Sequence, residues 1–79
     1  MIKTYFTFGS DPLYPFSRDE YVAVYGESVA DCVHKFMKKY PNPRPGCSHL
    51  VNCAFFYKEE EWKTFYTHYY GPEPVEVIE

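Results

Sequence analysis

The sequence predicts a small α+β domain, in which a mostly antiparallel sheet of about four strands carries two helices in the order β-β-α-β-α-β. Four apolar runs have the composition of strands: residues 2–8, 20–25, 50–57 and 75–78. Two stretches between them, residues 28–40 and 59–70, carry apolar side chains at the spacing of an α-helix. Because 79 residues are the size of one small domain, residues 1–79 are expected to fold as a single unit.

The first two strands are expected to pair as an antiparallel hairpin with a wide loop. Side chains of a strand alternate between the two faces of a sheet. One face then carries the apolar residues Ile2, Phe6, Phe8, Val22 and Val24, which we expect to face the core. The other face carries Lys3, Tyr5, Thr7, Tyr21, Ala23 and Tyr25.

The loop between these strands is unusually apolar. It begins at Gly9 and contains two prolines, with Leu13, Tyr14 and Phe16 close to them. Two interpretations are open. The loop folds back over the core, or it is a contact loop whose large side chains meet a partner.

The helix expected over residues 28–40 has a start signal and a stop signal. Ser28 is a good N-cap, and Pro41 cannot continue the helix. Its apolar stripe consists of Val29, Val33, Phe36, Met37 and Tyr40. Lysines near the carboxyl end, at positions 35, 38 and 39, suit the helix dipole and are expected to be solvated.

A stiff proline-rich connector follows, and the next strand leads directly into the second helix. Acidic residues at the start of this helix suit the helix dipole, and Glu59 and Lys63 are spaced as a favourable ion pair. Its apolar stripe consists of Trp62, Phe65, Tyr66 and Tyr69. The short last strand is expected to place Val75 and Val77 on one face.

Charge and composition limit the classes of function. The net charge is −3, and it arises in residues 41–79, which hold six acidic and three basic residues, so direct nucleic-acid binding is not expected. No run has the length of a membrane span or the pattern of a signal peptide, which predicts a cytoplasmic protein. Three cysteines, an odd number, fit a reducing compartment better than a disulfide framework.

No motif in the sequence predicts catalysis or a cofactor. Cys47, His49 and Cys53 offer zinc ligands, but the chain has no CxxC pair, so a metal site is only an alternative. Cys47 with His49 is a weak signal for a thiol nucleophile. The sequence therefore favours a non-enzymatic protein.

If both helices cover one face of the sheet, the tyrosines of the other face remain free for a partner. The expected partner-binding residues are Tyr5, Tyr21 and Tyr25 of this face, Tyr14 and Phe16 of the loop, and Glu59 and Glu60 at the start of the second helix. The acidic pair would engage a basic surface of the partner. The same face would also allow a homodimer.

Three segments of the sequence form a recognisable pattern: Tyr5–Asp11, Tyr21-Val22, and Cys53–Tyr57 with Glu59–Trp62. In this pattern the chain resembles a family of small uncharacterised proteins of phages and prophages of Gram-positive gut bacteria. The resemblance implies a phage accessory protein in the bacterial host cytoplasm, with a host defence component such as a CRISPR effector as the partner to be inhibited. Two alternatives are an oligomeric sponge that sequesters a nucleotide signal and a small zinc-binding protein.

Overall fold

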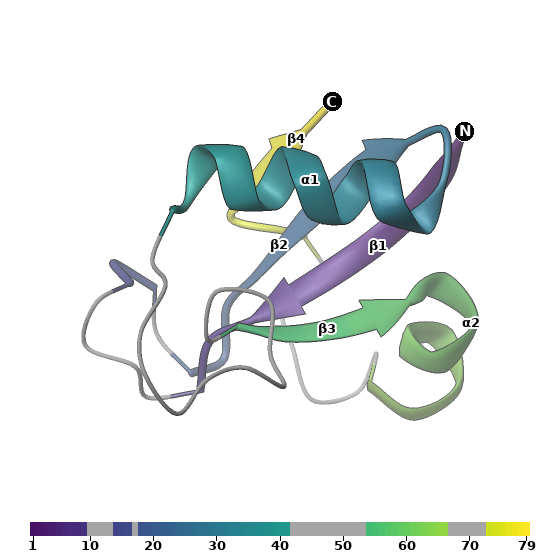
Figure 1. The fold of residues 1–79 in the computed structure, drawn as a ribbon. Coiled ribbons are helices and arrows are strands. Elements are labelled where there is room, and N and C mark those ends of the chain that lie inside the picture. The colour runs from purple at the N-terminus through teal and green to yellow at the C-terminus, as the bar shows by residue number, and fades with distance from the viewer. Residues whose placement is uncertain (10–13, 17, 42–53, 67–72) are drawn as a thin grey trace.

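The computed structural model confirms an α+β fold with the element order that the sequence predicts (Figure 1). It describes residues 1–9, 14–16, 18–41, 54–66 and 73–79. The elements are β1 (Ile2–Thr7), β2 (Tyr21–Gly26), α1 (Val29–Lys39), β3 (Phe55–Lys58), α2 (Glu59–Glu61), the π-helical segment η1 (Trp62–Tyr66) and β4 (Glu76–Ile78). The expected strand residues 50–53 and helix residues 67–70 lie outside the described part.

The four strands form one mixed sheet in the order β3-β1-β2-β4. β1 pairs antiparallel with β2, so the predicted hairpin is confirmed, and it pairs antiparallel with β3 on its other side. β4 joins the opposite edge of the sheet in parallel to β2. In the described residues, no helix combines the length and the apolar character needed to cross a membrane.

The first face of the sheet packs against α1. Phe6 of β1 stacks on Phe36 of α1, with ring centroids 3.9 Å apart and planes 1° from parallel. The buried residues of this core are Phe6, Phe8, Tyr14, Val22, Val24, Cys32, Phe36 and Ala54. The predicted inward facing of Phe6, Phe8, Val22 and Val24 is confirmed, whereas Ile2 at the start of β1 is 37% exposed and does not join this core.

The start of α1 is fixed by two side chains. Ser28 is the N-cap, and its hydroxyl oxygen accepts a hydrogen bond from the backbone N–H of Asp31 at 3.1 Å. The Asp31 carboxylate accepts one from the backbone N–H of Glu27 at 2.9 Å. That backbone hydrogen bond is the main reason why the pKa of Asp31 lies below its usual value. The predicted helix start is therefore confirmed.

The second face of the sheet is not uncovered, which corrects the expectation for its tyrosines. Trp62 of η1 lies over this face and stacks on Tyr5, with ring centroids 4.5 Å apart. The ring centroid of Tyr21 lies 4.8 Å from that of Trp62, and Tyr57 of β3 packs against this cluster. The physical reason is the burial of aromatic area, because the Trp62 ring packs against Tyr5, Tyr21 and Tyr57 on this face. Phe36 of α1 thus packs on the first face and Trp62 of η1 on the second, so the two helices contribute to opposite faces of the sheet.

The last strand is held to α1 by a polar cluster. The Glu76 carboxylate accepts a hydrogen bond from the Tyr40 hydroxyl and lies 2.7 Å from the Lys39 ammonium group. Burial alone would raise the pKa of Glu76, but the hydrogen bonds from Lys39 and Tyr40 outweigh it, so this pKa is lowered. Ile78 packs against the first core, while Val75 and Val77 remain exposed.

Candidate functional site

Most of the predicted partner-binding aromatic residues are used inside the fold. Tyr5 is 4% exposed and Tyr21 is 5% exposed, both under Trp62. Burial raises the pKa of Tyr21, as expected for a phenol enclosed by rings. These two side chains present almost no area to a partner of the folded chain.

The apolar loop follows the first of its two interpretations. Tyr14 is 6% exposed, and its ring centroid lies 4.5 Å from that of Phe8. Phe16 is half-buried, and its ring lies 4.7 Å from that of Phe8. Tyr14 and Phe16 therefore fold back over the first core, and the contact-loop interpretation is wrong for Tyr14. Leu13 lies outside the described residues.

The topology brings the other predicted residues to one end of the sheet. β2 and β3 run antiparallel to β1, and β4 runs parallel to β2, so three strands end where β1 begins. Tyr25 lies near the end of β2, and Glu59 and Glu60 directly follow the end of β3. Figure 1 shows both termini and α2 at this end.

Two hollows adjoin each other at this end, and both are lined by Met1 and Lys3. The first measures about 320 Å³ and lies beside α2, where its lining includes Lys58, Glu59 and Glu60. The second measures about 440 Å³ and is lined by Met1, Lys3, Tyr25, Glu73, Pro74, Val77 and Glu79. We name this region, which lies at the end of the sheet where β1 begins, the β1-end surface. We define it by Met1, Lys3, Tyr25, Glu59, Glu60 and Val77.

Lys3 forms the centre of the β1-end surface and is held by aromatic rings. Its ammonium nitrogen lies 5.1 Å from the ring centroid of Tyr5 and 5.5 Å from that of Tyr25. Both distances are within cation–π range. Burial alone would lower the pKa of Lys3, but its interactions with Tyr5 and Tyr25 raise it overall. Lys3 is therefore a positioned cation at neutral pH.

Carboxylates outnumber lysines around the second hollow, which is lined by Glu73 and Glu79 against Lys3. The first hollow is balanced, with Glu59 and Glu60 against Lys3 and Lys58, and Met1, which carries the N-terminal ammonium group, lines both. Glu59 also lies 3.8 Å from Lys63, which confirms the predicted ion pair. An acidic rim around apolar side chains can attract the cations of a partner and bury apolar area against it.

The expected zinc ligands Cys47, His49 and Cys53 lie outside the described residues. Within the described part of the chain, no three His, Cys, Asp or Glu residues are grouped to hold a metal ion. Cys32 is buried, and its thiol donates to the Val24 carbonyl oxygen at 3.6 Å. Its position fits the small core residue that the sequence predicts.

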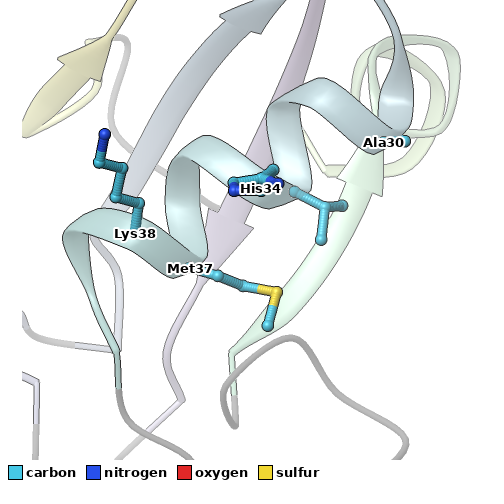
Figure 2. Close-up of a pocket in the computed structure, with 5 residues that line it drawn as sticks. Ala30, His34, Met37 and Lys38 are labelled. Carbon is cyan, nitrogen blue, oxygen red and sulfur yellow. The ribbon is translucent and has the colours of Figure 1, made fainter.

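A third hollow, on α1, was missed by the sequence reasoning. It measures about 730 Å³ and is lined by Ala30, Val33, His34, Met37 and Lys38. Figure 2 shows its labelled side chains following one another along this side of the helix. Met37 was expected in the apolar stripe of α1, yet it is 43% exposed. The available signal was its place directly after Phe36, because adjacent helical residues point about 100° apart.

Comparison with known proteins gives no match to a family model, to a curated protein or to a solved structure.

Proposed function

We propose that this chain is a non-enzymatic binding protein that contacts a partner protein through the β1-end surface. The observation that carries the proposal is the coincidence of exposed apolar side chains with an acidic rim. Met1 is 80% exposed, Val77 is 46% exposed, and Tyr25 lies half-buried beside them. Exposed apolar groups rimmed by charge are typical of protein contact sites.

The acidic rim supports a basic partner surface. Glu60 beside the first hollow is exposed, and so are Glu73 and Glu79 at the second hollow. Opposite charge around an apolar centre guides association and selects the partner. A channel that holds nucleic acid has the required basic character. The resemblance to phage proteins makes a defence component of the bacterial host the partner class that we propose, with inhibition as the result of binding.

A plating experiment tests the inhibitory function. Phage is plated on bacteria that carry a nuclease-based defence system, with and without expression of the full chain. We expect the chain to raise the number of plaques on strains with at least one such system and to leave strains without defence unchanged. Unchanged plating across a panel of defence systems would refute the inhibitory function.

A capture experiment tests the surface separately. A photo-reactive amino acid at position 25 or 60 of the full chain should cross-link the same basic host protein in cells. The matched control places it at Pro15, which is exposed between Tyr14 and Phe16, two residues that pack on Phe8 at the opposite end of β1. Adducts of equal yield at position 15, or different proteins captured at positions 25 and 60, would show that the surface is chosen wrongly.

A further inference from the structure

α1 presents a second contact face that is separate from the β1-end surface. One side of the helix faces the sheet and contributes the fully buried residues Cys32 and Phe36. A side turned away from the sheet is normally polar in a helix of this kind. Here the hollow of about 730 Å³ begins at Val33, which is partly buried against the core, and continues over the exposed residues Ala30, His34, Met37 and Lys38 (Figure 2).

The length of this lining suits a helix as occupant. Positions 30, 33, 34, 37 and 38 form one continuous stripe of an α-helix. From the first to the last, the stripe rises about 12 Å along the axis. This length corresponds to about two turns of a partner helix, which would anchor side chains at i, i+3 or i+4, and i+7. The exposed thioether of Met37 adapts its shape to such anchors.

The charged residues at the edge of the hollow indicate which charge the partner carries. Lys35 pairs with Asp31, and Lys39 pairs with Glu76, so both ammonium groups are used inside the molecule. Lys38 makes no ion pair with any residue that the structure describes, and it lines the hollow together with His34. An apolar stripe with a free cation at one end is complementary to an apolar helix that carries carboxylates.

We infer that the α1 hollow binds an amphipathic helix of a partner protein, whose apolar side chains contact Val33 and Met37 and whose carboxylate meets Lys38. The β1-end surface prefers the opposite charge. The chain therefore has two contact faces of opposite preference, and the two can be measured independently of each other.

The two methionines of the chain make the test direct, because one lies at each face. The full chain is prepared with ¹³C-methyl methionine, and each methyl signal is followed by NMR. The probes are two synthetic helical peptides with the same leucine face, one flanked by glutamates and the other by lysines. A soluble nitroxide first reports whether the Met37 methyl group is accessible in the free chain, with Met1 as the reference.

We expect the glutamate peptide to shift the Met37 signal and to leave the Met1 signal in place. Lys38→Glu should weaken this binding roughly three- to tenfold, the size of effect expected for an exposed ion pair that is reversed. Lys63→Glu is the matched control, since it makes the same charge change on η1, and it should leave the affinity unchanged.

Four results would overturn the inference. The first is a Met37 methyl group that is inaccessible to the nitroxide, and the second is no shift with either peptide. The third is equal binding of both peptides at Met37. The fourth is a Met37 shift that depends on protein concentration without peptide, which would make a second copy of the chain the occupant. A Met1 shift with the lysine peptide reports only on the β1-end surface, so failures of the two proposals are distinguishable.

Discussion

Trp62 packs on the second face of the sheet, as Phe36 packs on the first. Its ring lies 4.5 Å from that of Tyr5, 4.8 Å from that of Tyr21 and 5.6 Å from that of Tyr57, and its side chain is 3% exposed. Aromatic contacts of this kind contribute about 0.5–1.5 kcal/mol each beyond the area that they bury. The Trp62 ring therefore makes a large contribution to holding the second helix against the sheet.

Replacing this ring is expected to be severe. We predict that Trp62→Ala lowers the free energy of unfolding by about 3–5 kcal/mol, the usual range for a buried tryptophan. Urea unfolding followed by circular dichroism measures the change. Trp62→Phe keeps an aromatic ring and should cost clearly less. If Trp62→Ala costs under about 1 kcal/mol, Trp62 does not support the fold as described.

Gly26 at the end of β2 leaves no room for a side chain. A Cβ at this position would lie 2.7 Å from the Asp31 carboxylate and 2.9 Å from the Cys32 sulfur. We predict that Gly26→Ala destabilises the chain by about 1–3 kcal/mol through overpacking, measured by the same unfolding experiment. Adding Cys32→Ala should recover part of the loss, because it removes one of the two close contacts. Additive costs in the double variant would contradict this explanation.

Residue alternation predicted the two faces of β1 and β2 but not which face meets solvent. Phe6 and Val24 were placed inward correctly because they are purely apolar. Tyr5, Tyr21 and Tyr25 share one face and one residue type, so their local sequence cannot separate them. Tyr5 and Tyr21 are buried because Trp62, about forty or more residues away along the chain, lies over them. This contact joins distant parts of the chain, and the local patterns of a single sequence do not reveal it.

At the scale of elements, β4 depends on one carboxylate. It is a three-residue edge strand, and Glu76 joins it to Tyr40 and Lys39 at the end of α1. Burial and the hydrogen bond to Glu76 raise the pKa of Tyr40, so its hydroxyl stays protonated and donates at neutral pH. The strand carries Val77, so this cluster also positions part of the β1-end surface.

We predict that Glu76→Gln lowers the free energy of unfolding by on the order of 1 kcal/mol at neutral pH. The folded-state pKa of Glu76 is lowered, so its contribution is complete above the ordinary value of 4.5 and is lost as the pH falls through the lower folded value. Urea unfolding of both proteins between neutral and acidic pH measures this. A difference that persists at the acidic end would contradict the assigned role of the carboxylate.

The order and type of the elements were largely predictable, but their partners in space were not. The Ser28 cap and Pro41 delimit α1 closely, since both signals are local. The start of the second helix was also predicted, and η1 is π-helical over Trp62–Tyr66. The parallel pairing of β4 with β2 could not be anticipated from three residues, because short strands carry little register information.

At the scale of the molecule, the β1-end surface exists because four strands place their ends together. The sequence identified Tyr25, Glu59 and Glu60 separately, and Met1, Lys3 and Val77 join them only in the folded sheet. The α1 hollow, in contrast, is lined by a positively charged side chain, that of Lys38. The acidic residues of the β1-end surface are therefore brought together by the topology, whereas the α1 hollow takes its charge from a single helix.

This division predicts a salt dependence. Association of the β1-end surface with a basic partner should weaken about tenfold or more between low salt and about 0.5 M salt, because exposed charges are screened. Surface plasmon resonance with the captured partner measures this, and Glu60→Gln should reduce the slope. An affinity that is independent of salt would mean that the acidic rim does not guide binding.

Trp62 of the second helix covers Tyr5 and Tyr21, which is why the contact surface that we propose lies at the end of the sheet and not on its tyrosine face. The chain has a single tryptophan, so acrylamide quenching of its fluorescence reports on Trp62 alone. The structure predicts emission typical of a buried indole and strong protection from the quencher. Quenching as efficient as that of the urea-unfolded chain would contradict the account, because the tyrosine face would then be open.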